Sequence, residues 1–298
     1  MNIFLAMIPA FLWGTTYAIT KYAMPDWPPI LLGALRALPA GVVLWLLKPS
    51  LPRGGQWRPL LLLAAVNIAL FFACIFVMAV NLPAAIAGVG MVSVPVVALL
   101  YAWLVKGQRP ALVQSICALA LVFLAWFLFD PKEVSLTLIG MLALFASLLC
   151  IVVGSALVQK FSMHIHWWTV LTWQLILGGT LLAIAALIQA FYLEPEAYQA
   201  LQNPIERQQW LAVLWLVLPN TAVAYSLYVW LLGRMSVVEF TFGTIANPIA
   251  GIVTAALLLA ETYQGWQYAL MMAMIVFSVT PQGVQLLRSR WENKKASI

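Results

Sequence analysis

The chain has few charged residues and few of the side chains that usually perform catalysis. Only 8% of its 298 residues are Asp, Glu, Lys or Arg, and it holds two histidines and three cysteines. Cys74, Cys117 and Cys150 all lie in apolar stretches without a CxxC pattern, which favours packing over metal binding or disulfide formation. No GxSxG, Walker or HExxH pattern is present. The sequence therefore indicates that the chain is not an enzyme, and we expect no cofactor and no metal.

Long apolar runs make up most of what is there. Hydrophobic residues account for 64% of the chain and the mean hydropathy is +0.99, a balance typical of membrane spans and not of soluble domains. The first run, Ile3–Tyr22, has no basic segment before it and leads straight into further runs. This favours a retained helix over a cleaved signal peptide. We therefore expect an all-α integral membrane protein.

Prolines, charge clusters and polar breaks divide the apolar sequence into segments of about 20 residues, the length that crosses a bilayer. Ten spans are expected, so both termini should lie on one side of the membrane. The spans are Ile3–Tyr22, Pro29–Leu47, Leu60–Val80, Ala84–Val105, Ala111–Phe129, Leu136–Val158, Trp167–Phe191, Trp210–Gly233, Val237–Ala260 and Trp266–Leu287.

Basic residues gather on one side of this expected topology. Eleven of the fifteen Lys and Arg residues fall on the side that holds the termini, three fall on the other side, and Arg36 lies within a span. The positive-inside rule makes the richer side cytoplasmic. The net charge of +6 is thus a topology signal, and we expect no nucleic-acid partner. The expected location is a bacterial inner membrane, with both termini in the cytoplasm.

The apolar pattern occurs twice along the chain. In the second span, Arg36 and Gly41 recur at one constant spacing as Gln174 and Gly179. From the third span onward a slightly longer spacing holds, and the matching pairs are Asn67 with Asn220, Gly90 with Gly243, and Pro95 with Pro248. Five spans per copy is an odd number, so the copies 1–132 and 133–298 should be inverted relative to each other. Inverted repeats are typical of secondary transporters, which bind substrate at the repeat interface near the bilayer midplane.

Several short motifs in these spans resemble those of the drug/metabolite transporter superfamily, EamA type. The resemblance covers essentially the whole chain. It is carried by Phe11-Leu12-Trp13-Gly14, Leu35-Arg36-Ala37, Ser93-Val94-Pro95, Ala246-Asn247-Pro248 and Leu259-Ala260-Glu261.

The resemblance implies ten helices in two inverted five-helix repeats around a central cavity. It implies that the first, third, fourth, sixth, eighth and ninth helices line this cavity, and that the chain exports or exchanges small metabolites, often amino acids. At the end of the fourth span the family usually has Glu after Gly, whereas Gly107 is followed here by Gln108. In the second repeat Glu261 keeps that carboxylate, for which we expect a structural role.

Amides inside the spans are the first candidate ligands for a substrate. Asn67 and Asn220 are repeat mates, and an amide both donates and accepts hydrogen bonds, which suits a zwitterionic or hydroxylated solute. Asn247 in the ninth span adds a third amide. The alternative role for such residues is to hold helices together, at about 1 kcal/mol each.

Two charged residues inside the spans allow two interpretations each. Arg36 lies about six residues into its span and could bind a substrate carboxylate or screen anions; it could equally extend its charge to the interface or cap a broken helix, and we favour this structural role. Glu239, near the start of the ninth span, could carry a proton through a transport cycle. Its alternative is an ion pair with Arg234.

Aromatic residues are dense in the first, third and eighth spans. Trp13, Tyr17, Phe72, Tyr225 and Tyr228 could line a cavity for an aromatic side chain or an organic cation. They could equally be packing residues. Phe72 and Tyr225 are again repeat mates.

The fourth and ninth spans combine small residues with proline. Gly243 belongs to a stripe of small residues that permits close helix approach, and Pro95 and Pro248 occupy equivalent positions. Proline in a span leaves a carbonyl without its hydrogen bond, which is tolerated only beside protein or water. We expect kinks there that let the helices move.

The sequence thus predicts a secondary transporter that moves small organic metabolites by alternating access. Export of amino acids or related neutral or zwitterionic solutes is the leading version, because Arg36 is the only expected buried cation. Uptake or exchange of another metabolite or an organic cation, or a membrane sensor that does not transport, are the alternatives. The expected partners are the lipid bilayer and the small-molecule substrate, with the monomer as the functional unit.

Overall fold

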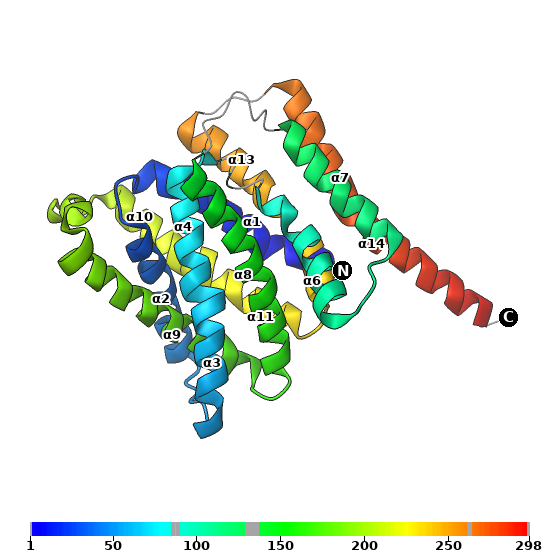
Figure 1. Cartoon of the computed structure of the whole chain (residues 1–298), viewed down its shortest axis with the longest axis horizontal. Helices are drawn as coiled ribbons and strands as arrows, with labels where there is room; N and C mark the ends of the chain where they lie inside the picture. The colour runs from blue at the N-terminus through cyan, green and yellow to red at the C-terminus, as the bar shows by residue number, and fades with distance from the viewer. Residues whose placement is uncertain (1, 85–86, 88–89, 129–136, 261–263, 297–298) are drawn as a thin grey trace.

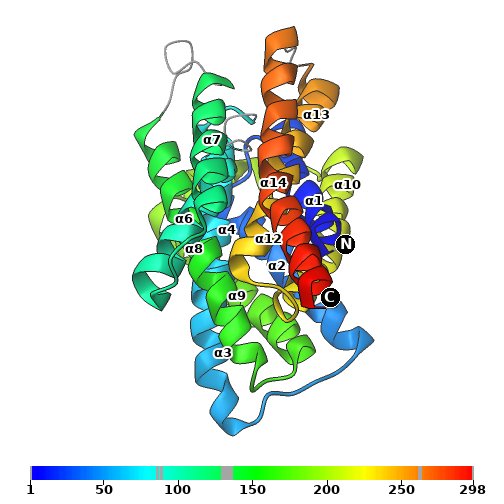
Figure 2. The same ribbon diagram turned by 90° about the vertical axis from the view of Figure 1, so that its right-hand side faces the viewer.

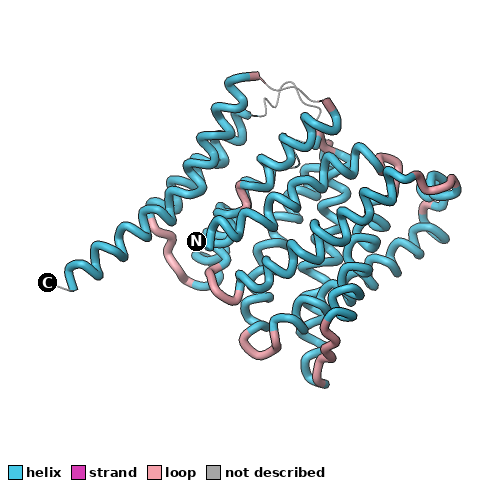
Figure 3. The backbone as a smooth tube through the Cα atoms, turned by 180° about the vertical axis from the view of Figure 1, so that it is seen from behind, coloured by secondary structure: helices cyan, strands magenta, loops and turns pink. Residues whose placement is uncertain are grey.

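The computed structural model describes residues 2–84, 87, 90–128, 137–260 and 264–296. Within these ranges the chain is helical and contains no β-strand (Figure 3). The α-helices are α1 (Asn2–Ala23), α2 (Pro29–Leu47), α3 (Trp57–Ala64), α4 (Phe71–Asn81), α6 (Val94–Lys106), α7 (Leu112–Leu128), α8 (Leu138–Ser162), α9 (Trp167–Ile188), α10 (Arg207–Val217), α11 (Ala224–Leu232), α12 (Val237–Gly243), α13 (Ala246–Leu259) and α14 (Gly265–Ala296). The 3-10 turns are η1 (Gly54–Gln56), η3 (Met91–Ser93) and η5 (Pro195–Gln202), and the π-helical turns are η2 (Ala65–Leu70), η4 (Gln189–Leu193) and η6 (Leu218–Val223).

Many of these helices are long and apolar enough to cross a membrane, which confirms the expected all-helical membrane protein. Among the described residues, six meet that test: Pro29–Leu47, Gly54–Asn81, Leu138–Ser162, Trp167–Leu193, Arg207–Leu232 and Val237–Leu259. Shorter apolar helices cover Met91–Lys106, Leu112–Leu128 and Gly265–Ser278. Part of the expected fourth span and the expected repeat boundary after residue 132 lie outside the described residues.

The ends of several helices follow directly from their sequence. Helix α2 begins at Pro29, whose fixed φ suits the first helical position and whose missing N–H is not needed there. Helix α8 begins after Thr137, whose hydroxyl accepts a hydrogen bond from the backbone N–H of Gly140 at 3.2 Å. Helix α14, in contrast, continues to Ala296, the last described residue, beyond the expected span end at Leu287.

Helices α2 and α9 pack against each other in an antiparallel pair with two equivalent contacts. A Cβ added to Gly41 would lie 2.8 Å from the backbone nitrogen of Ile176, and one added to Gly179 would lie 2.5 Å from that of Leu38. Both glycines are therefore needed for the close approach. Because the spacing from Gly41 to Gly179 equals the spacing from Leu38 to Ile176, the second contact repeats the first with the two helices exchanged. This is the pattern of a local two-fold axis.

The two π-helical turns η2 and η6 occupy the same position in the two copies. Each interrupts a long helix, η2 between α3 and α4 and η6 between α10 and α11. The first residue of η2 is separated from the first residue of η6 by the same spacing that relates Asn67 to Asn220, and so are the last residues of the two turns. Asn67 and Asn220 are each the third residue of their turn. A π turn inside an α-helix is rare and frequently marks a functional position.

The fourth and ninth spans each contain a break, and each is followed by a residue with left-handed backbone. The break in the first copy is η3, just before α6, and the break in the second separates α12 from α13. The residues directly after the two helices that follow are Gly107 and Ala260, which are repeat mates at the spacing of Asn67 and Asn220. Both adopt left-handed backbone, with φ of 67° and 54°. Two stretches of different sequence thus reach the same local conformations.

Two apolar cores hold the helices together. The larger core joins helices of both copies and includes Trp13, Phe72, Tyr225 and Tyr228. Helices α7 and α14 lie side by side at one edge of the molecule, and α14 extends beyond it (Figures 1 and 2). The smaller core includes residues of both of these helices. It is formed by Val92, Cys117, Leu121, Leu128, Phe242, Ile245, Ile252, Met271 and Met274.

Candidate functional site

A narrow cavity lies between helices of both copies. Its walls come from α1, α2, α4, η3 and α6 in the first copy and from α8, the α12–α13 break and α13 in the second. The empty space amounts to about 420 Å³ when any solvent at its opening is counted, and little of it is wide enough for water. The lining residues are Trp13, Thr16, Tyr17, Arg36, Phe71, Ile75, Met91, Val94, Ile151, Thr244 and Asn247.

Arg36 lies at the wall of this cavity with its side chain 3% exposed. Its Nε donates to Thr221 Oγ1 at 2.8 Å, its Nη1 to Thr16 Oγ1 at 3.5 Å, and its Nη2 to the carbonyl of Asn220 at 3.4 Å. The guanidinium carbon stands 4.3 Å from the ring centroid of Phe72. The arginine therefore points into the protein and not toward the membrane interface.

Asn220, predicted as a substrate ligand, is fully buried and binds helix α1 instead. Its Nδ2 donates to the carbonyl of Leu12 and to Thr15 Oγ1 at 3.2 Å, and its Oδ1 accepts a bond from Thr16 Oγ1 at 3.2 Å. This amide is outside the set of residues that line the cavity. Its contacts favour the helix-joining interpretation.

The repeat mate Asn67 is also fully buried and also reaches the other copy. Its Nδ2 donates to Gln174 Oε1 at 2.8 Å, and its Oδ1 accepts a bond from the Tyr228 hydroxyl at 3.4 Å. Gln174 is the residue that corresponds to Arg36. In each copy, then, a polar residue of the second helix of one half contacts the π turn of the other half.

The aromatic residues form one cluster in which only part faces the cavity. Trp13 has its ring centroid 5.2 Å from that of Tyr225 and 5.4 Å from that of Tyr228, and Phe72 stands 5.6 Å from Tyr225. Of the five predicted aromatics, Trp13 and Tyr17 line the cavity, whereas Phe72, Tyr225 and Tyr228 lie behind it. The cluster thus supplies both a wall and its support.

Asn247 is the predicted amide that does line the cavity. Its Oδ1 is buried and has no hydrogen-bond partner in the described part of the chain. Its backbone carbonyl sits against Gly14, where an added Cβ would lie only 2.1 Å from the oxygen. The glycine of the first-helix motif is therefore required for α1 to pack on α13.

The predicted gating residues lie at helix breaks. Pro95 follows η3 at the start of α6, and Pro248 follows the break between Gly243 and Ala246 at the start of α13. A Cβ added to Gly243 would lie 2.6 Å from Cβ of Ala6, so this glycine permits the contact with α1. Glu261 lies outside the described residues.

Glu239 forms a capping box at the start of α12. Its Oε2 accepts bonds from the backbone N–H and the hydroxyl of Ser236 at 2.8 and 3.0 Å, and its own N–H donates to that hydroxyl at 3.1 Å. The guanidinium of Arg234 stands 3.9 Å from the ring centroid of Trp230. This position favours a structural role for Glu239 over proton transfer.

Comparison with known proteins identifies the family. Residues 1–129 and 138–280 match the EamA-like transporter family. The chain belongs to the EamA-like transporter family. The matching family is a family of transporters, which agrees with the expectation that the chain is not an enzyme.

Relatives of this EamA-like transporter align over nearly its whole length. It is 27% identical to Protein PecM of Dickeya dadantii (strain 3937) over 283 residues, which cover 93% of this chain and 91% of that protein. It is 27% identical to the uncharacterized inner membrane transporter YedA of Escherichia coli (strain K12) over 282 residues, which cover 90% and 86%. One solved crystal structure of a protein superposes with a TM-score of 0.68 at 18% identity, over 94% of this chain and 97% of that one, which shows the shared fold.

Sequence reasoning missed several cavity residues of this EamA-like transporter. Thr16 and Thr244 line the cavity, and Thr221 binds Arg36. All three are polar residues within expected spans, so the rule that polar side chains in spans face a partner or a cavity could have found them. The apolar lining residues carry no comparable signal, because they look like any other residue of a span.

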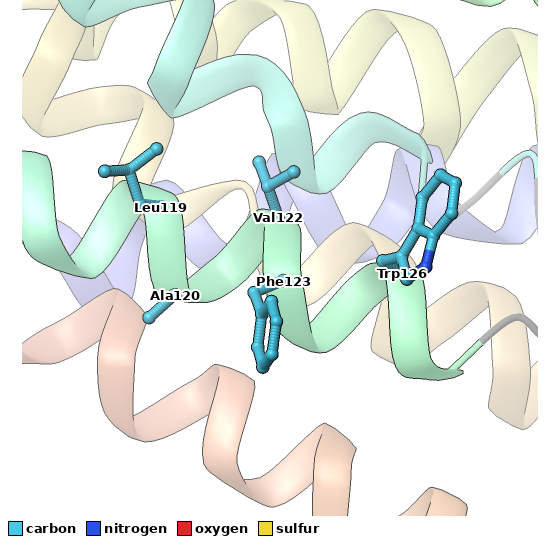
Figure 4. Close-up of a pocket in the computed structure, with 5 residues that line it drawn as sticks. All are labelled: Leu119, Ala120, Val122, Phe123 and Trp126. Carbon is cyan, nitrogen blue, oxygen red and sulfur yellow. The ribbon is translucent and has the colours of Figure 1, made fainter.

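A second hollow of this EamA-like transporter lies on the outer face of α7 (Figure 4). Every described residue that lines it comes from that one helix, and all of these residues are apolar. Leu119, Phe123 and Trp126 are each more than half exposed. A one-sided apolar surface on a membrane helix suits lipid chains and offers a metabolite no orienting contact.

Proposed function

We propose that this transporter moves small neutral or zwitterionic metabolites across the bacterial inner membrane by alternating access, with the cavity around Trp13 and Arg36 as its substrate site. The observation that carries the proposal is the position of the cavity, whose walls come from both copies of the repeat. Such an interface is where inverted-repeat transporters bind substrate. Export of amino acids or related solutes is the version that we favour.

We propose further that the fold consists of ten spans in two inverted repeats, with the boundary near residue 132. The antiparallel contact of α2 and α9 supports this arrangement, because a two-fold relation between antiparallel helices inverts one copy. The family match in two successive stretches, 1–129 and 138–280, also supports it. The basic residues on the terminal side support cytoplasmic termini, and a monomer suffices to enclose the cavity.

The narrow cavity suggests how transport would proceed. A metabolite larger than water does not fit between the walls as they stand, so helices must separate to admit one. The breaks before α6 and α13 and the π turns η2 and η6 interrupt regular hydrogen bonding at equivalent places in both copies. Bending at these places in one copy and then in the other would open the cavity to each side in turn.

Counterflow in proteoliposomes tests the proposal. Liposomes are preloaded with one unlabelled solute at a time, from neutral aliphatic amino acids, aromatic amino acids, organic cations and nucleosides. We expect labelled solute to accumulate only where the matching solute is inside. Trp13→Ala should abolish accumulation, and Trp126→Ala, on the outer face of α7, should leave it unchanged.

The other results separate the alternatives. Equilibration without saturation would indicate a pore. Binding by folded protein without counterflow across the panel would indicate a sensor and would overturn the proposal.

A further inference from the structure

Arg36 puts a permanent positive charge at the wall of the cavity. Its guanidinium remains protonated in proteins. Its hydrogen bonds in the described part of the chain go to the neutral groups of Thr16, Asn220 and Thr221, and its cation–π contact is with Phe72. A buried charge without a counter-ion is costly, and a charged residue within a span marks a functional site. Among the described residues, the positive charge at this wall is therefore uncompensated.

The guanidinium also has N–H groups that make no hydrogen bond to a described residue. It carries five N–H groups, and three hydrogen bonds to described residues account for its contacts. Two of the three, at 3.4 and 3.5 Å, are longer than a usual N–H···O bond. Because Arg36 is itself a lining residue, an anion in the cavity can take up the remaining donors and displace the two weak contacts.

The repeat mate of Arg36 shows that the packing does not need a charge. Gln174 occupies the equivalent position, is also buried, and binds Asn67 in the π turn η2, just as Arg36 binds Asn220 and Thr221 in η6. A neutral side chain thus makes the contact between the second helix and the opposite π turn. The cation of Arg36 needs another explanation.

Two further groups of the same cavity lack a partner among the described residues. Trp13 Nε1, a donor, and Asn247 Oδ1, an acceptor, are both buried without a hydrogen bond there, and both residues line the cavity. Buried polar atoms without partners are costly. A ligand that both donates and accepts hydrogen bonds would satisfy them.

The geometry points to a carboxylate-binding site at Arg36. The carboxylate of the substrate binds the guanidinium, an N–H of the substrate donates to Asn247 Oδ1, and its apolar part lies against Phe71, Ile75 and Ile151. The inference rests on the proposed function, because it assigns the ligand of the same cavity. One cation matches one negative charge, so the substrate class is a small monocarboxylate with an N–H donor, and organic cations are excluded.

Matched solutes with and without the carboxylate test this inference. The probes are L-leucine and L-phenylalanine, the carboxamide of each, and the amine that lacks the carboxyl group. Binding to the purified full-length protein is measured as a shift in thermal unfolding in detergent, and transport as counterflow. We expect an acid to bind at least about tenfold more tightly than its amide or amine, as a hydrogen bond to a charged group implies.

Variants of Arg36 connect the preference to this residue. Arg36→Gln, which copies the repeat mate, should weaken binding of the acid by roughly 10- to 100-fold and abolish the preference over the amide. Arg36→Lys should keep the preference with lower affinity. The matched control is Arg58→Gln, an exposed arginine of α3, which should behave as the wild type.

The outcomes distinguish this inference from the proposed function. Equal binding of acid and amide, binding of neither acid, or a folded Arg36→Gln protein that still prefers the acid would overturn the carboxylate site, whether or not counterflow occurs. Acid binding that depends on Arg36 without counterflow would keep the site and refute transport. If Arg36→Gln fails to fold, the wild-type comparison and Arg36→Lys decide.

Discussion

Arg36 and Gln174 stand at equivalent positions of the two copies, and each contacts the π turn of the opposite copy. Arg36 binds the carbonyl of Asn220 and the hydroxyl of Thr221, and Gln174 accepts a bond from Asn67. Both contacts join the second helix of one half of the sequence to the π turn of the other half, but one is made by a charged side chain and the other by a neutral one. Only the contact made by Arg36 places a cation there.

Asn220→Ala should lower stability more than Asn67→Ala. Asn220 makes hydrogen bonds to Leu12, Thr15 and Thr16, whereas Asn67 bonds to Gln174 and Tyr228. At about 1 kcal/mol per interhelical bond, we expect losses of roughly 3 and roughly 2 kcal/mol. Thermal unfolding in detergent measures both. Equal losses would contradict the difference that we assign to the two contacts.

Gly14→Ala should prevent α1 from packing on α13. The new Cβ would lie 2.1 Å from the carbonyl oxygen of Asn247, and a backbone atom cannot yield as a flexible side chain can. We expect a loss of about 3 kcal/mol or more, measured by thermal unfolding. Gly233→Ala is the control, because its Cβ would lie 3.5 Å from the nearest atom and should change stability by less than about 0.5 kcal/mol.

Ala260→Gly should stabilise the protein and Gly107→Ala should destabilise it. Both positions end a helix in left-handed backbone, which costs a residue with a Cβ about 1–2 kcal/mol. After the larger unfolded-state entropy of glycine is counted, we expect changes of about 0.5–1 kcal/mol in opposite directions. Thermal unfolding of the two variants measures both changes. Changes of the same sign would show that one of these helix ends is not left-handed in the membrane.

Pro248→Ala should lower the rate of counterflow more than it lowers substrate affinity. The proline follows the break between α12 and α13, and alanine would allow regular hydrogen bonding to resume there. Pro95→Ala tests the equivalent break before α6. Equal losses of rate and affinity would argue against hinges at the two prolines.

Glu239→Gln should leave counterflow and its pH dependence unchanged. Glutamine also completes a capping box with Ser236, whereas it cannot carry a proton. Counterflow measured across a range of pH checks this. A pH profile that flattens in the variant would restore the proton-coupling interpretation.

The sequence was informative where a feature is local or repeated. Pro29–Leu47 predicted α2 to the residue, because proline and apolar length act along one helix. The spacing that links Asn67 with Asn220 also links two π turns and two left-handed helix ends.

The features that the sequence could not predict are the contacts between helices and the side chains that line the cavity. The sequence does not give the rotation of a helix about its axis, so it could not show that Asn220 faces α1 and that Arg36 lines the cavity. The helices expected around the cavity included the eighth and omitted the second. The structure places Arg36 of α2 at the wall and Tyr225 of α11 behind it. The apolar wall residues Ile75 and Ile151 had no signal at all.

The paired contacts of Gly41 with Ile176 and of Gly179 with Leu38 have the form of a symmetric dimer made from one chain. In a dimer of identical subunits, every substitution is made twice, so a cation at one side of the axis brings a second cation at the other. Covalent linkage removes that constraint. The chain can keep the packing of a homodimer while its two sides acquire different chemistry, one with arginine and one with glutamine.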